Sequence, residues 1–147
     1  DKDARRGVLR RADMLRLRGL VHLSQGTAVL ESGRSGDAIP HAKICLKHLP
    51  GFAPATLFAG RVYVTVGQAE KAVRVLFASW KRYKHPQVGD MLHSLAKTNS
   101  KKHSKLLHLL STEPGDTAIL WTCRACGHGQ PEWSLNCPTC DAFDTMR

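Results

Sequence analysis

Residues 53–86 read APATLFAGRVYVTVGQAEKAVRVLFASWKRYKHP, and this stretch decides the fold of most of the chain. It repeats the pattern of the residues before it at an offset of 34 positions. Small residues recur at this offset, since Gly60, Gly67 and Ala72 match Gly26, Gly33 and Ala38. Large apolar residues recur as well, with Val73, Trp80 and Tyr83 matching Ile39, Leu46 and Leu49. A regular repeat of this length predicts a row of similar helical units.

The repeat predicts helical hairpins that stack side by side. A period of 34 residues is that of the tetratricopeptide repeat, in which small residues let the two helices of a unit approach closely. We therefore predict a mainly α fold, with a tetratricopeptide-type solenoid over residues 1–116. Its repeats cover about 19–52 and 53–86, and a truncated helical pair at 87–111 caps the stack. A generic helical bundle is the alternative.

Turn residues predict where the helices end. The segment 31–37, ESGRSGD, suits a helix C-cap followed by Asp37 as an N-cap, and residues 66–69 form a shorter equivalent. Pro40 is tolerated in the first turn of a helix. We predict helices at about 4–32, 37–48, 54–66, 69–83, 87–98 and 101–110. The last of these docks through Leu106, Leu107, Leu109 and Leu110.

Four cysteines in two matched pairs follow the helical part. Cys123 and Cys126 form one C-x2-C motif, and Cys137 and Cys140 form the other. Each pair places two thiolates around one tight turn, so the two turns can enclose one tetrahedral metal ion. We predict a four-cysteine zinc ribbon, rubredoxin-like in type, over residues 119–147. The segment 127–136 is about long enough for a hairpin that joins the two turns.

The four-sulfur set predicts a closed, structural site that holds one zinc ion, with iron as the alternative. Gly127 and Asp141 follow the second cysteine of each pair, where a positive φ turns backbone N–H groups toward sulfur. So short a ribbon has few apolar residues to bury, and we expect its fold to depend on the metal. A disulfide framework and a redox dithiol remain the competing interpretations of the cysteines.

The charge of the chain is unevenly distributed. The formal net charge is +10, and residues 1–118 carry 20 Lys and Arg against 9 Asp and Glu. The sequence contains no apolar run long enough to span a membrane. Because it begins at Asp1 and not at Met, we expect a piece of a longer protein, in which an upstream segment could carry a membrane anchor.

The stacked hairpins predict an interaction scaffold with no catalytic residues. A concave groove would take a protein or peptide partner, and the residues expected to line it are His22, Gln25, Thr56 and Arg61. The alternative is a nucleic-acid-binding solenoid, in which phosphates would meet Arg5, Arg6, Arg10, Arg11, Arg16, Arg18, Lys97, Lys101, Lys102 and Lys105. The sequence favours the protein partner, because aromatic residues are not interleaved with these charges.

Catalysis finds little support in the sequence. No paired carboxylates, nucleophile–base spacing or phosphate-binding loop stands out. Cys45 is expected to be a small core residue, and His128 a surface residue beside the metal site. Haem ligation by a histidine is conceivable at His22, His41, His48 or His93, which no sequence feature distinguishes.

The tail resembles one family closely. The elements that carry the resemblance are Trp121, the two cysteine pairs with Gly127 and His128, the segment Glu132-Trp133-Ser134 and the end Ala142-Phe143-Asp144-Thr145. Together they resemble the C-terminus of the HemY-like proteins of alphaproteobacteria. This resemblance implies a membrane-anchored tetratricopeptide protein on the cytoplasmic face of the inner membrane, associated with haem biosynthesis and with membrane enzymes as candidate partners. The arrangement is also similar to that of LapB-like regulators of lipopolysaccharide synthesis, whose cysteine pairs are separated by a similar gap. The Glu-Trp-Ser and Phe-Asp-Thr elements fit the HemY-like tail better.

Overall fold

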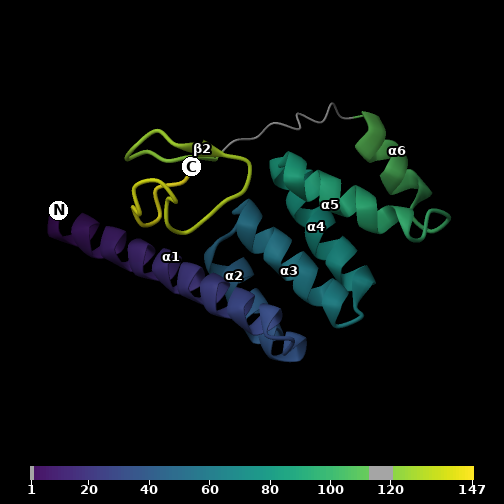
Figure 1. The fold of residues 1–147 in the computed structure, drawn as a ribbon, viewed down its shortest axis with the longest axis horizontal. Coiled ribbons are helices and arrows are strands. Elements are labelled where there is room, and N and C mark those ends of the chain that lie inside the picture. Colours follow the sequence, from purple (N-terminus) through teal and green to yellow (C-terminus); the bar gives the residue numbers. More distant parts are fainter. Residues whose placement is uncertain (1, 113–120) are drawn as a thin grey trace.

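The computed structural model describes residues 2–112 and 121–147, and these residues form a row of helices with a small ribbon beside it (Figure 1). The elements are α1 (Lys2–Glu31), the 3₁₀ turn η1 (Ser35–Ala38), α2 (Ile39–His48), α3 (Ala53–Thr65), α4 (Ala69–Tyr83), α5 (Pro86–Lys97), α6 (Ser104–Thr112), β1 (Trp121–Thr122) and β2 (Gly129–Gln130). The mainly helical class is confirmed. The predicted boundary between helical part and ribbon, at 116–119, lies outside the described residues.

The helices stack in sequence order. Each helix packs against the next one along the chain, and α3 also contacts both α1 and α5. The first helices of successive hairpins, α1, α3 and α5, therefore lie next to one another (Figure 1). None of the described helices combines the length and the apolar character needed to cross a bilayer.

The predicted turns recur in the structure with the same hydrogen bonds. After α1, Gly33 has a φ of 86° and the N–H of Arg34 donates to the carbonyl of Val29. After α3, Gly67 has a φ of 80° and the N–H of Gln68 donates to the carbonyl of Tyr63. Both ends are Schellman-type caps, in which glycine takes the left-handed conformation at low cost. The offset of 34 residues thus corresponds to a repeated backbone structure.

Close helix approach explains the glycine within α1. A Cβ atom on Gly26 would lie 2.5 Å from Cζ of Phe58 in α3 and 2.7 Å from Cβ of His41 in α2. The matched alanines, Ala38 and Ala72, are fully buried. Small residues at these positions therefore let two neighbouring helices pack against α1 and against each other, as the repeat predicts.

Three details differ from the expectations. Asp37 does not cap α2, because residues 35–38 form a 3₁₀ turn in which the N–H of Asp37 donates to Arg34, and α2 begins only at Ile39. The last helix begins at Ser104 and not at 101. Leu106 and Leu110 pack against the core, whereas Leu109 is exposed because it lies on the outer side of this short helix.

Aromatic contacts hold the ribbon against the helices. Phe52, at the start of α3, makes edge-to-face contacts with Trp133 and Trp121, whose ring centroids lie 5.2 Å and 6.1 Å away. Trp121 also stacks on His85, just before α5. Aromatic pairs in these geometries contribute about 0.5–1.5 kcal/mol beyond the area that they bury. The ribbon is therefore joined to two different helical hairpins through one apolar interface.

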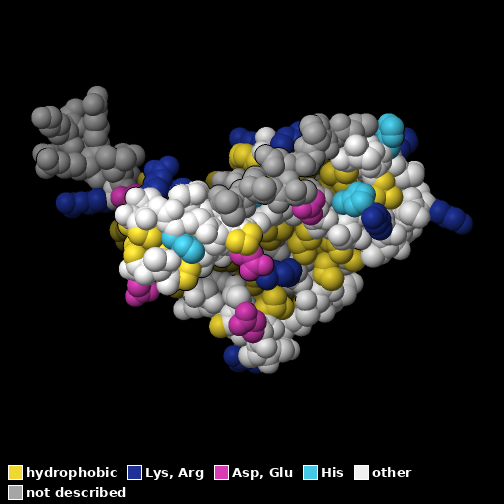
Figure 2. Space-filling model, turned by 45° about the horizontal axis from the view of Figure 1, so that its top comes forward, with side chains coloured by type: hydrophobic (Ala, Val, Ile, Leu, Met, Phe, Trp, Pro, Cys, Tyr) yellow, Lys and Arg dark blue, Asp and Glu magenta, His cyan; other side chains and the backbone are white. Residues whose placement is uncertain are grey.

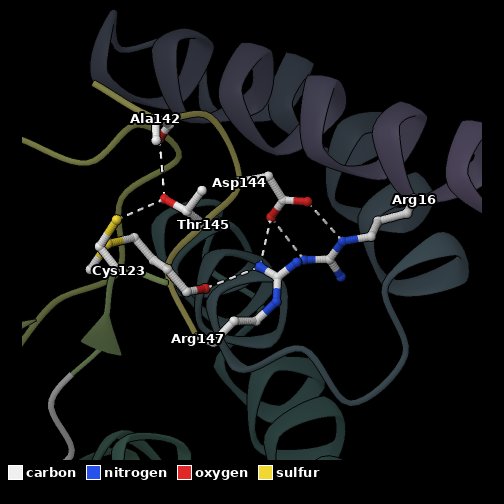
Figure 3. A network of polar contacts seen from close by, with 7 residues as sticks. Arg16, Cys123, Ala142, Asp144, Thr145 and Arg147 are labelled. Carbon is white, nitrogen blue, oxygen red and sulfur yellow. Dashed lines mark hydrogen bonds and ion pairs between the residues drawn. The ribbon is translucent and has the colours of Figure 1, made fainter. Parts of the chain in front are cut away.

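A charged contact adds to this interface on the α1 side (Figure 3). Arg16 donates two hydrogen bonds to Asp144, through Nε and Nη2, each at 3.0 Å. Its guanidinium also lies over the ring of Phe52, at 5.2 Å from the centroid. Partial burial disfavours the charged carboxylate, but the hydrogen bonds from Arg16 and Arg147 outweigh it and keep the pKa of Asp144 below its ordinary 3.8. Because two hydrogen bonds join the same two side chains, this contact fixes the orientation of the ribbon on α1 as well as its position.

The aromatic interface predicts the effect of shortening Phe52. We expect Phe52→Ala to lower the free energy of unfolding by about 2 kcal/mol, because a half-buried ring between two tryptophans is lost. Urea unfolding followed by tryptophan fluorescence measures the loss. Phe143→Ala is the matched control, since Phe143 is 52% exposed and its removal should cost less than about 0.5 kcal/mol. Equal losses for the two variants would contradict the interface.

Candidate metal centre

The four cysteines lie on two turns with the same backbone structure. In the first turn, the N–H of Gly127 donates to the carbonyl of Cys123 and the N–H of Cys123 donates to the carbonyl of His128. In the second turn, the N–H groups of Asp141 and Cys137 make the equivalent bonds to Cys137 and Ala142. Gly127 and Asp141 have φ values of 79° and 60°, so the predicted left-handed residue follows each pair. Each C-x2-C motif thus forms one compact turn that presents two sulfurs.

The strand pairing differs from the expected hairpin. Residues 127–136 do not form a hairpin between the turns. Instead, β1 pairs with β2 across the first turn, and a bridge between Asn136 and Phe143 closes the second. The physical reason is that each turn needs its own flanking backbone to hold the hydrogen bonds around its two cysteines.

The sulfur geometry fits one tetrahedral ion. The four Sγ atoms all lie within 4.8 Å of one another, with Cys123 and Cys140 at 3.7 Å and Cys126 and Cys137 at 3.6 Å. A tetrahedral zinc ion with Zn–S bonds of about 2.3 Å separates its sulfurs by roughly 3.8 Å. All four cysteines are free of disulfide bonds, which disfavours the disulfide framework. The set could therefore hold a metal ion.

Hydrogen bonds surround the sulfurs. The hydroxyl of Thr145 lies 3.1 Å from Sγ of Cys123 (Figure 3). Backbone N–H groups point at the sulfurs in matched fashion, with Ala125 and Cys126 serving Cys123, and Thr139 and Cys140 serving Cys137. Four thiolates around a divalent ion carry a net charge of −2, which such donors disperse. The first cysteine of each pair is buried and the second is exposed.

Without a cation, the four thiols cannot all ionise. Hydrogen bonds from Thr145 and from the backbone of Cys126 lower the pKa of Cys123 to about 6. At Cys126 the N–H of His128 favours the thiolate, but loss of hydration among the packed sulfurs and the hydrogen bonds with Cys137, Cys140 and Cys123 outweigh it and raise the pKa to about 12. A bound divalent ion supplies the charge that lets every sulfur act as a thiolate ligand. The site can thus hold a metal, and its four protein ligands leave no open position for a substrate.

His128 and Cys45 are not among the clustered ligands. The side chain of His128 is half-buried and not fully on the surface, and its Nε2 contacts the side chain of Gln130 at 3.2 Å. Cys45 is buried in the helical core, where its thiol points to the carbonyl of Gly19 and burial raises its pKa to about 12. Such a thiol is unreactive, and Cys45 is a core residue.

A groove of about 710 Å³ lies between the helices and the ribbon. Its apolar lining comes from α1, α3, α5 and the ribbon, and includes Leu20, Leu23, Leu57, Met91, Trp133 and Leu135. Figure 2 shows apolar side chains gathered along a hollow on this face of the molecule. The first helices of successive hairpins therefore share one concave surface.

The structure places one of the four predicted partner-binding residues in this groove. Arg61 lines it, one turn after Leu57 on α3. Thr56 is only 3% exposed, and its hydroxyl faces Ser79 on α4, so the prediction for Thr56 is wrong. The reason is that Thr56 lies one position off the face formed by Pro54, Leu57 and Arg61.

The other two predicted residues lie on α1 outside the groove lining. Gln25 is exposed, and His22 is half-buried against α2, where the Nδ1 atoms of His22 and His41 lie 2.9 Å apart. Both residues lie on a different side of α1 from Leu20 and Thr27, which line the groove.

The sequence interpretation missed the ribbon as part of the groove. Residues 132–135 contribute one wall, through Glu132, Trp133, Ser134 and Leu135. A signal was present, because Trp133 and Leu135 are large apolar residues between the cysteine pairs, where the metal turns need none. Such residues in so small a ribbon indicate a surface that packs against something else.

Comparison with known proteins gives no relative for this chain. No protein-family model matches it, and neither the curated proteins nor the solved structures contain a match. The function of the chain therefore has to be inferred from the metal centre and the groove.

Removal of the metal should release the ribbon. We expect chelation, or the single change Cys137→Ser, to abolish amide protection in residues 121–147 and to shift the fluorescence of Trp121 and Trp133 to the red, because the sulfur cluster no longer closes the two turns. Hydrogen exchange and emission spectra measure both effects. Cys45→Ala is the control, since it removes a cysteine outside the cluster and should leave the ribbon protected. An unchanged ribbon in the chelated protein would contradict a metal-dependent fold.

The surroundings of His22, which include His41, predict a lowered pKa for its imidazole. Burial, and then the charges of His41, Arg18 and His48, lower the pKa of His22 below 6.5. Because the unfolded chain binds the proton more tightly, this group makes the fold less stable as pH falls through 6.5. An NMR titration of the imidazole proton measures the pKa directly, and Arg18→Gln should raise it. A pKa at or above 6.5 in the unsubstituted protein would rule this interpretation out.

Proposed function

We propose that this chain is a non-catalytic adaptor whose groove holds a segment of a partner protein and whose cysteines hold one structural zinc ion. The observation that carries the proposal is the groove itself. It is lined by the first helices of three helical hairpins and by the ribbon, and its lining combines apolar side chains with polar and charged ones, among them Glu31, Arg61 and Glu132, as expected for a recognition surface.

The tetratricopeptide interpretation supports this use of the groove. In stacked helical hairpins, the concave surface is where extended peptides and helices are bound. The repeated Schellman-type caps after α1 and α3, together with the 34-residue period, favour repeats of this class. Arg61 lines the groove and has no ion pair among the described residues, and so is available to a carboxylate of the partner.

Zinc is the favoured ion. The sulfur separations of 3.6 Å and 3.7 Å suit a tetrahedral ion of zinc size, and the four ligands form a closed, structural set. Iron satisfies the same geometry and is the alternative. Because the ribbon forms one wall of the groove, the ion supports the binding surface and takes no part in chemistry.

The resemblance of the tail to HemY-like proteins suggests where the adaptor acts. We propose a role at the cytoplasmic face of the inner membrane, with membrane enzymes associated with haem biosynthesis as partners. A LapB-like role in lipopolysaccharide synthesis is the alternative within the same architecture. Both are consistent with a groove that recognises another protein.

A photo-crosslinking amino acid placed in the groove tests the adaptor function. With the crosslinker at Leu57, we expect irradiation of cells that produce the protein to give a discrete crosslinked product whose attached segment is identified by mass spectrometry. The same crosslinker at Ala78, exposed on α4 away from the groove, is the control. The adduct at Leu57 should weaken when Arg61→Glu is added. Identical adducts at both positions, or none at either, would remove the support for the groove.

Elemental analysis tests the ion. We expect one zinc per chain in a colourless protein, and loss of that zinc in Cys137→Ser. A red protein that contains iron would replace zinc in the proposal, and a protein with neither metal would remove the metal site.

A further inference from the structure

The outer face of α1 carries an unusual share of exposed apolar side chains. Of the eight large apolar residues that are exposed among the described residues, four lie on α1: Met14, Leu15, Leu17 and Val21. Met14 is 70% exposed, the highest of the eight. In Figure 1 the N-terminal half of α1 extends beyond α2 and α3, with only the ribbon near it. Single exposed apolar side chains scattered over a surface need no explanation, but several gathered on one helix indicate a contact surface.

Three of these four residues form a narrow line along the helix, and Leu15 lies to one side of it. Met14, Leu17 and Val21 are three and four residues apart, and we name these three residues the α1 seam. The same spacing continues to Ser24 and Ala28, two small residues at the edge of the groove. Alternating steps of three and four are typical of a helix that packs along a second helix. The small residues beyond the seam would let the second helix stay close to α1 as it nears the groove.

Positive charge borders the α1 seam. Arg11 and Arg18 are exposed and lie seven residues apart along one flank, while the opposite flank carries Asp13. Neither Arg11 nor Arg18 has an ion pair among the described residues, in contrast to Arg16, which is held by Asp144. Charges in these flanking positions select the partner of a packed helix through opposite charges on it.

We propose that the α1 seam is a second docking surface, outside the groove lining, that binds one amphipathic helix of a partner protein with acidic residues along the flank facing Arg11 and Arg18. A second copy of this chain fits poorly. Arg10 continues the line of the seam at its N-terminal end, so two α1 helices paired in parallel would bring like charges together, and the net charge of +10 adds repulsion in either orientation. A lipid surface fits poorly as well, because the apolar line is much narrower than the face of a helix that lies in a membrane interface.

Binding of a synthetic helix to the full chain tests the proposal. The probe is a fluorescein-labelled peptide of about three heptads, with Leu and Ala at the positions that face the seam and Glu at all flanking positions, and its twin carries Lys in place of Glu. At about 0.15 M salt, where the Debye length is roughly 8 Å, the overall charge of the protein is largely screened. We expect the Glu peptide to bind roughly tenfold more tightly than the Lys peptide by fluorescence anisotropy.

Matched variants distinguish binding at the seam from binding in the groove and from attraction to the overall charge of the protein. Leu17→Ser should weaken binding of the Glu peptide, whereas Leu57→Ser, the same change in the groove, should not. Arg18→Glu should reduce the preference for the Glu peptide, whereas Lys43→Glu, the same charge change on the exposed side of α2, should leave it intact. Circular dichroism of each variant confirms that the helices remain folded.

Four results would overturn the proposal. These are equal binding of the two peptides, no binding of either, a loss caused by Leu57→Ser instead of Leu17→Ser, and equal effects of Arg18→Glu and Lys43→Glu. Self-association of the chain that Leu17→Ser abolishes would assign the seam to a second copy. Binding to phosphatidylserine vesicles that Leu17→Ser abolishes would assign it to a lipid surface. The groove and its crosslinking result stand or fall independently of all these outcomes.

Discussion

The packing of four sulfurs within 4.8 Å of one another is the constraint on which the rest of the ribbon depends. Neutral thiols at this separation gain little from one another, and thiolates repel strongly. Backbone N–H groups and the hydroxyl of Thr145 nevertheless point at the sulfurs, an arrangement that favours the thiolate form. Such a site becomes favourable only with a cation at its centre. With an ion at this centre, the folding of residues 121–147 and metal binding would be coupled in one equilibrium.

This equilibrium extends into the helical part of the molecule. Thr145 contacts a sulfur, and the residue before it, Asp144, holds Arg16 on α1. Trp133, between the two turns, packs on Phe52 and lines the groove. Whatever holds the sulfurs together therefore also positions a wall of the groove that the helices alone would leave open. The contacts of the ribbon reach both α1 and the hairpin that begins with α5, so in the proposed adaptor the ribbon would be a metal-supported part of the binding surface.

The helices and the metal turns were predictable because their signals are local. The glycine caps, the 34-residue period and the cysteine spacing each depend on residues near one another in the chain, and the structure reproduces the predicted helices to within a few residues. The start of α2 was missed, because Pro40 and Asp37 both suit a helix start and the 3₁₀ turn that precedes it has no sequence signal of its own.

The residues that line the groove were harder to predict from the sequence. On α3, a shift of one position separates Leu57, which lines the groove one turn before Arg61, from buried Thr56. A repeat pattern does not fix the rotation of the helix about its own axis closely enough to tell these two positions apart. The docking of the ribbon joins residues more than a hundred positions apart, such as Arg16 and Asp144, and no local pattern predicts it.

The sulfur cluster has an inner and an outer side. Cys123 and Cys137 face the protein, whereas Cys126 and Cys140 face solvent. A competing ligand would therefore reach a bound ion past the outer two sulfurs, and metal exchange would begin at one of them while the inner pair stays bound. Exchange by this route is stepwise, and its rate rises with the concentration of the incoming ligand. The ribbon would then yield its ion quickly to a small, strong chelator and slowly to dilution alone.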